Sequence, residues 1–163
     1  IKHEPFEDSR GYFTRLYCKN KFNSLGLEKE VTQSNISLSK FELTLRGFHY
    51  QEEPFAQERT IYCIQGAIFD IVVDLRKESQ TYLQWESFHV EDSDNASIYV
   101  PKGCANAFLT LKPNTLCNYY FSSDFSPDHY KGIRYDDPLF KFEWVKEPKV
   151  ISEKDLTFKN FKK

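Results

Sequence analysis

The chain has 163 residues, of which 22 are Lys or Arg and 24 are Asp or Glu, so its formal net charge is −2. This near balance does not indicate a polyanionic partner such as nucleic acid. No apolar run approaches the roughly 20 residues of a membrane-spanning helix, and the first residues lack an apolar signal core. We therefore expect a single domain over residues 1–163 with no nucleic-acid or membrane partner. Because the sequence contains no methionine, we also expect a piece of chain upstream of Ile1.

The cysteine and aromatic contents indicate the structural class of the protein and its cellular compartment. Four cysteines occur without a CxxC pair, which favours reduced, buried thiols in a cytoplasmic protein. Phe, Tyr and Trp make up 17% of the chain, and such a composition favours strands over helices.

The predicted elements are mostly short strands. A turn at 6–11 leads into a strand over 12–18, and residues 21–30 predict one short helix that Gly26 weakens. Further strands are predicted over 31–38, 43–51, 58–65, 68–76, 81–89, 96–101, 105–111 and 116–122. The chain then ends in short apolar pieces at 141–145 and 151–156. Strands spaced at about 8–12 residues with turn residues between them indicate a small, closed, mostly antiparallel sandwich or barrel.

Two of these strands have faces that bear on function. One face of 31–38 carries amides and hydroxyls, which indicates either a solvated surface or a polar pocket wall. In 68–76 one face is wholly apolar and must meet a core, whereas the other carries Asp70 and Asp74. These carboxylates need partners if they are buried.

A barrel of this size can enclose one small ligand. The polar side chains expected around it are Arg46, His49, Gln51, Arg59, Asp70, Asp74, Asn106 and Tyr119. His49 lies in a strand-like run among cations and carboxylates, as a proton-transfer residue would. A structural, hydrogen-bonded role is the alternative for both His49 and Tyr119.

Other common chemistries lack their motifs. The histidines, His3, His49, His89 and His129, are widely separated and form no HxH or HxxxH spacing, so we expect no catalytic metal. A Gly-rich phosphate loop, GxSxG and CxxC are all absent, which leaves nucleotide hydrolysis, acyl transfer and thiol redox chemistry without support.

Several motifs follow one another in the order found in one enzyme family. They are DSRGYF at 8–13, QSNIS at 33–37, LRGFHYQ at 45–51, AQ at 56–57, GAIFDIVVDLR at 66–76, SQTY at 79–82, PKGCA at 101–105, DP at 137–138 and SEKD at 152–155. Together they resemble the dTDP-4-dehydrorhamnose 3,5-epimerase family over essentially the whole chain. The resemblance implies an all-β, cupin-type jelly-roll barrel with a few short helices. It also implies a cytoplasmic homodimer that acts without metal or cofactor on a nucleotide-diphosphate 4-keto-6-deoxysugar, in deoxysugar and cell-surface polysaccharide (O-antigen) biosynthesis.

The family's chemistry assigns roles to matching residues. In a 4-keto sugar a base removes an acidic proton at C3 or C5, and an acid returns one on the opposite face of the resulting enolate. The resemblance implies that His49 is the base, Asp155 its orienting carboxylate and Tyr119 the acid. Arg59, where the family usually has lysine, is the candidate for enolate stabilisation. The implied substrate-binding residues are Arg10, Gln33, Asn35, Arg46, Asp70 and Asn106.

Two further departures refine the expectation. Asn106 stands where the family usually has histidine, and an amide cannot titrate. Arg15 stands where the family commonly has glutamate near the nucleobase. We therefore expect inversion at C3, with C5 as a further possibility. The alternatives are a full 3,5-epimerase, a 3,4-ketoisomerase, a non-catalytic nucleotide-sugar-binding cupin and a metal-dependent cupin oxygenase.

Overall fold

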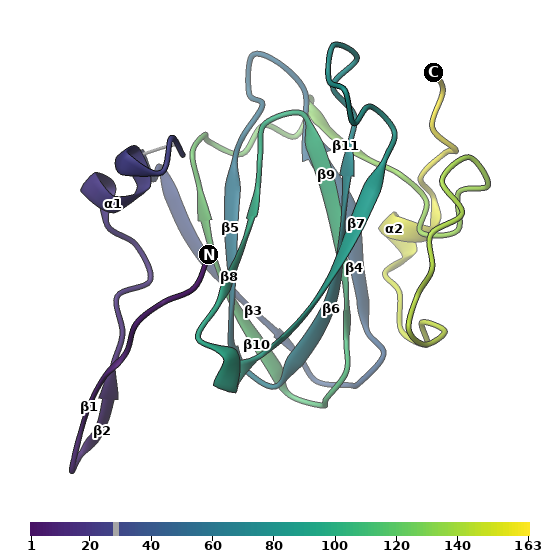
Figure 1. Ribbon diagram of the computed structural model, residues 1–163. Coiled ribbons are helices and arrows are strands. Elements are labelled where there is room, and N and C mark those ends of the chain that lie inside the picture. Colours follow the sequence, from purple (N-terminus) through teal and green to yellow (C-terminus); the bar gives the residue numbers. More distant parts are fainter. Residues whose placement is uncertain (28–29) are drawn as a thin grey trace.

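Two facing β-sheets form a barrel in the computed structural model, which describes residues 1–27 and 30–163 (Figure 1). Its strands are β3 (Gln33–Ser39), β4 (Leu45–Gln51), β5 (Arg59–Gln65), β6 (Ala67–Asp74), β7 (Trp85–Glu91), β8 (Ser97–Val100), β9 (Cys104–Thr110), β10 (Thr115–Phe121) and β11 (Tyr130–Gly132). The short helices are α1 (Lys19–Ser24), the 3₁₀ turn η1 (Asp92–Asp94) and α2 (Glu153–Leu156).

The strand order is that of a jelly roll. One sheet has the order β3-β10-β5-β8 and the other the order β11-β4-β9-β6-β7, and neighbouring strands within each are antiparallel. Because β3, β4 and β5 alternate between the sheets, the chain repeatedly crosses the barrel. The expected all-β jelly-roll barrel with a few short helices is confirmed.

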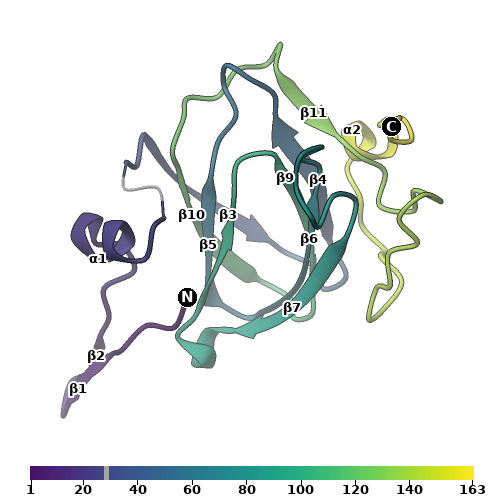
Figure 2. The same ribbon diagram turned by 45° about the horizontal axis from the view of Figure 1, so that its top comes forward.

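The barrel has an apolar core on each side of its five-stranded sheet. Inside, Ile61, Ile68, Val100 and Phe108 pack between the two sheets. Outside, the C-terminal segment covers the sheet (Figure 2). The outer core joins apolar side chains of the sheet to those of this segment: Phe48, Ile71, Val73, Ala105, Ala107, Ile133, Phe140, Phe142, Trp144 and Phe161. The apolar face expected for 68–76 is thus buried.

A second small sheet projects from the barrel. Strands β1 (Phe6–Asp8) and β2 (Gly11–Phe13) form a hairpin that extends away from the sheets (Figure 1, lower left). Phe6 and Phe13 expose 76% and 65% of their surface. Large apolar surfaces of this kind on an isolated hairpin are typical of protein–protein contact sites.

Three predicted elements are wrong at their boundaries. The strand expected over 12–18 ends at Phe13, because β2 pairs only with the three residues of β1 in the described part of the chain. The helix expected over 21–30 is instead Lys19–Ser24, and residues 28–29 of that prediction lie outside the described residues. Residues 81–83 form a turn before β7 rather than its first part.

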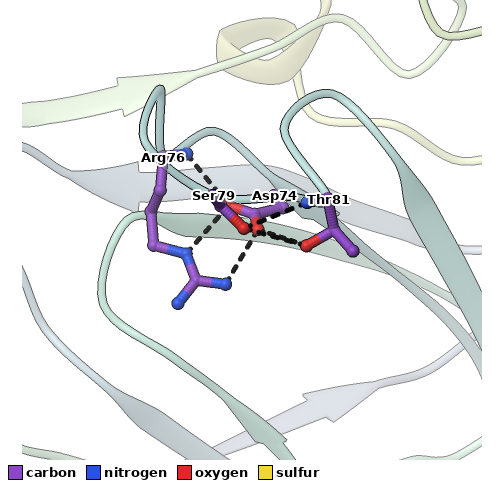
Figure 3. A network of polar contacts seen from close by, with 4 residues as sticks. All are labelled: Asp74, Arg76, Ser79 and Thr81. Carbon is purple, nitrogen blue, oxygen red and sulfur yellow. Dashed lines mark hydrogen bonds and ion pairs between the residues drawn. The ribbon is translucent and has the colours of Figure 1, made fainter.

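Asp74 is one of the two carboxylates on the inner face of β6, and residues of the loop after β6 donate hydrogen bonds to it (Figure 3). Its Oδ1 accepts from the backbone N–H and the Nε of Arg76, both at 2.9 Å. Its Oδ2 accepts from Nη2 of Arg76 at 2.8 Å and from the Thr81 hydroxyl at 2.7 Å. The pKa of Asp74 is held well below its usual value, first by the Arg76 hydrogen bond. Asp74 therefore fixes the loop between β6 and β7 and takes no part in the pocket below.

Within the described residues, no helix is both long enough and apolar enough to span a membrane.

Candidate active site

A pocket of about 260 Å³ lies between the two sheets and receives side chains from both. Its lining residues are Asn35, Ile36, Ser37, Arg46, His49, Arg59, Asn106, Phe108, Tyr119, Phe121 and Tyr130. Most of the site residues expected from the sequence therefore meet in one place.

An irregularity in β4 brings Arg46 and His49 to the same pocket. Side chains three positions apart on a regular strand face opposite sides. Here the pairing of β4 with β9 shifts its register between Arg46 and His49. Gly47 lies at this point with φ of 122°, and a Cβ there would come within 2.5 Å of the Asn106 carbonyl oxygen. Only glycine permits this close approach of the two strands.

His49 is paired with a carboxylate from the far end of the chain. Its Nε2 lies 2.7 Å from Oδ1 of Asp155. The hydroxyl of Ser152, the N-cap of α2, accepts from the Asp155 backbone N–H, which fixes the start of that helix. Burial by itself raises the pKa of Asp155, but the hydrogen bond and charge of His49, together with hydrogen bonds from the Gly47 backbone and Ser152, hold that pKa below its usual value. Asp155 is thus an anion positioned to orient the imidazole and stabilise its protonated form.

Tyr119 stands on the opposite sheet. Its hydroxyl lies 2.8 Å from the hydroxyl of Ser37 on the paired strand β3. Burial, followed by the nearby Cys117, raises the pKa of Tyr119 well above its usual value. The phenol is therefore protonated at neutral pH and is a proton donor across the pocket from His49.

Arg59, Asn106 and Asp70 form a buried polar chain along the pocket wall. Nη1 of Arg59 donates to Oδ1 of Asn106 at 3.0 Å, and Nδ2 of Asn106 donates to Oδ2 of Asp70 at 2.8 Å. Arg59 also lies over the Phe121 ring, 5.8 Å from its centroid. These three hydrogen-bonded side chains place a buried cation, Arg59, in the pocket that His49 and Tyr119 also line.

The remaining predicted binding residues differ in their positions. Arg46 is half-buried at the pocket and donates from Nε to the Ser39 hydroxyl at 3.0 Å. Asn35 lines the pocket, and Gln33 lies two residues earlier on β3, outside the lining. Arg10 is on the projecting hairpin, where it pairs with Asp8 and is 88% exposed. Within one chain Arg10 does not reach the pocket, contrary to expectation.

Tyr130 is a pocket residue that sequence reasoning missed. Its ring centroid lies 5.2 Å from that of His49, and Nζ of Lys154 lies 4.1 Å from its ring centroid. Burial, and then the Asp155 carboxylate, raise the pKa of its phenol. Strand β11 is only three residues long, so no alternating pattern marks it in the sequence.

No metal centre is evident at this pocket in the part of the chain that the structure describes. Among residues 1–27 and 30–163, no group of three His, Cys, Asp or Glu side chains is arranged to hold a metal ion. A histidine held by a carboxylate, a protonated phenol on the facing wall and a buried cation in the same pocket suit the removal and return of a proton beside a carbonyl group.

Comparison with known proteins identifies one enzyme family. The family model for dTDP-4-dehydrorhamnose 3,5-epimerase matches residues 1–163. The protein of that name from Sinorhizobium fredii is 38% identical over 156 residues, which cover 95% of this chain and 80% of the relative. The crystal structure of the Bacillus anthracis protein of that name, with TDP and PPi bound, has a TM-score of 0.95 at 36% identity and covers 98% of this chain and 91% of its own. The expected cupin-type fold is confirmed by this likeness.

A third similar structure is that of a protein whose name gives a narrower activity than 3,5-epimerisation. The structure of ChmJ, a 3'-monoepimerase from Streptomyces bikiniensis in complex with dTDP-quinovose, has a TM-score of 0.90 at 28% identity. It covers 98% of this chain and 81% of its own.

Proposed function

Because the chain belongs to the dTDP-4-dehydrorhamnose 3,5-epimerase family, we propose that it epimerises a 4-keto-6-deoxyhexose carried on a nucleoside diphosphate, without a cofactor. The observation that carries this proposal is the placement of the His49–Asp155 pair and Tyr119 on opposite sheets around one pocket. A protein that only bound the sugar would need no opposed base and acid.

The proposed reaction uses these groups in turn. His49 removes the proton from the carbon beside the keto group, and Asp155 stabilises the resulting imidazolium. Electron density moves onto the keto oxygen, where the Arg59 guanidinium stabilises the enolate. Tyr119 then protonates the opposite face of the carbon, which inverts the centre. The Ser37 hydroxyl is placed to donate to the tyrosinate until solvent restores its proton.

The diphosphate is proposed to lie at the rim of the pocket. Arg46 offers charge-assisted hydrogen bonds there, and Asn35 and Gln33 offer amides from β3. Arg10 would complete this set from a second copy of the chain, because its own hairpin projects away from the barrel (Figure 1).

A homodimer would also cover exposed apolar surface. Besides the hairpin aromatics, Ile36 and Leu38 on the edge strand β3 are 69% and 50% exposed. An edge strand with such residues is a site for pairing with another chain. We place this dimer in the cytoplasm, in keeping with free thiols at all four cysteines, and its product in cell-surface polysaccharide synthesis.

The proposed outcome is inversion at C3. Asn106, which cannot titrate, is the residue that motivates this choice, and one structural relative is named a 3'-monoepimerase.

The test is incubation with dTDP-4-keto-6-deoxyglucose in deuterated water, followed by NMR of the product. We expect deuterium at C3 with inversion there, and a loss of at least about 10³-fold in the exchange rate for His49→Ala. Inversion at both carbons would replace the C3 proposal by the full 3,5-epimerase. A moved carbonyl group would indicate a ketoisomerase. Exchange undiminished in His49→Ala would overturn the mechanism.

A further inference from the structure

The buried chain of Arg59, Asn106 and Asp70 separates two opposite charges. Arg59 is 7% exposed and Asp70 is fully buried. A buried cation and carboxylate ordinarily pair directly. Yet between these two described residues no ion pair forms, and the Asn106 amide bridges them instead.

Hydrogen-bonding capacity fixes the orientation of that amide. A guanidinium can only donate, so the oxygen of Asn106 must face Arg59 and its nitrogen must face Asp70. Asp70 consequently receives one hydrogen bond from a neutral group, and its Oδ1 has no partner. A fully buried carboxylate with so little compensation is unfavourable in its charged form.

The electrostatic balance at Asp70 agrees with this geometry. Burial raises the pKa of Asp70 to about 8, against the smaller opposing effects of Asn106 and Arg59. The titratable or charged groups facing it are Arg59 on β5 and Cys117 and Tyr119 on β10. Its register partners on β7 and β9 are Phe88 and Phe108, which carry no charge.

We propose that Asn106 and Asp70 are positioning residues. The Asn106 amide holds Arg59 in place, and Asp70 remains uncharged, so that the guanidinium of Arg59 keeps its full positive charge for the substrate. This rests on the proposed function for the identity of the group that Arg59 meets, the enolate oxygen. A neutralised Arg59 would give that oxygen only weak stabilisation, since the site's electrostatic contribution depends on net charge as well as on geometry.

The first test replaces Asp70 by its uncharged isostere. We expect kcat of the unaltered chain to fall above about pH 8 as Asp70 ionises, and we expect Asp70→Asn, which mimics the protonated acid, to lack this fall. An identical pH profile in the two proteins between pH 6 and 9 would overturn the proposal.

Thermal unfolding gives a readout that does not depend on activity. Between the unfolded pKa of roughly 3.9 and the folded pKa, the native Asp70 holds a proton that the unfolded chain has released, so stability falls as pH rises. Asp70→Asn lacks this effect. Its Tm relative to the unaltered chain should therefore rise by about 5 °C from pH 5 to pH 8. A constant Tm difference would show that Asp70 is ionised and would overturn the proposal.

The second test adds a charge beside Arg59. Asn106→Asp places a carboxylate against the guanidinium, whereas Asn106→Leu removes both hydrogen bonds of the amide and adds no charge. We expect Asn106→Asp to lower kcat by about 100-fold with little change in KM, and Asn106→Leu to lower it by about tenfold. Equal losses in the two variants would contradict a role for net charge.

These readouts separate two kinds of failure. If the unaltered protein does not epimerise dTDP-4-keto-6-deoxyglucose while the Tm difference between it and Asp70→Asn still changes with pH, the proposed function fails and the uncharged state of Asp70 stands. If epimerisation is found and the Tm difference is constant, this further inference fails by itself.

Discussion

Tyr119 is the residue at which proton removal and inversion can be separated. The proposed base, His49, and the proposed acid, Tyr119, lie on different sheets, as groups that serve opposite faces of a sugar would. Tyr119→Phe keeps the ring beside Phe121 and removes the proton donated to the carbon. We expect substrate deuterium exchange to continue through His49 while inversion falls by at least about 100-fold, as NMR in deuterated water would show. Exchange and inversion falling in parallel would assign Tyr119 to the removal step instead.

Among the site residues, those on strands with a clear alternating pattern could be predicted from the sequence. Arg59 and Tyr119 lie on strands whose alternation places them inside the barrel, as the structure does. Asp155 carries no such pattern: it is in a four-residue helix 106 positions from His49, and only family resemblance brought the two together. Tyr130 was missed for the same physical reason, since chain folding rather than local periodicity places it at the pocket.

At the scale of elements, β4 depends on its irregular pairing with β9. In Gly47→Ala the new methyl group would meet the Asn106 carbonyl oxygen at 2.5 Å and Ala107 at 2.6 Å, in addition to the strain at φ of 122°. We expect a loss of about 3 kcal/mol or more in the free energy of unfolding, measured by urea titration. Activity should fall as well, because His49 and Arg46 are placed by this segment.

Gly11 offers a matched control for that substitution. Its φ is 127°, nearly that of Gly47, but an added Cβ would have no neighbour within 4 Å. Gly11→Ala should therefore show the backbone strain alone, about 1 kcal/mol. Equal losses at the two positions would mean that the close approach of β4 and β9 contributes nothing.

The strand alternation that predicts most of the barrel fails at this same element. Strict alternation puts Arg46 and His49 on opposite faces, and the register shift that unites them depends on how closely β9 approaches Gly47. Strands β5, β6, β9 and β10 were predicted to within one or two residues at each end, because each is long and has a buried face. The hairpin β1–β2 was not, since each of its strands has only three residues and all of them are exposed.

At the scale of the whole molecule, the position of the hairpin bears on the proposed dimer (Figure 1). Arg10 lies away from the pocket of its own chain, while the exposed aromatics around it indicate a covering partner (Figure 1). If Arg10 serves the partner's pocket, a mixed dimer of Arg10→Ala and His49→Ala chains contains one intact site. That site combines His49 of one chain with Arg10 of the other.

Mixing the two inactive variants therefore distinguishes the arrangements. We expect co-expressed or unfolded and co-refolded chains to recover roughly a quarter of the unaltered activity, since half of the dimers are mixed and each has one working site of two. Each variant alone should stay below about a tenth of that activity and elute as a dimer in size-exclusion chromatography with light scattering. If Arg10 served its own chain, both sites of the mixed dimer would lack a residue, and mixing would restore nothing. A monomeric elution of the unaltered chain would exclude the shared site altogether.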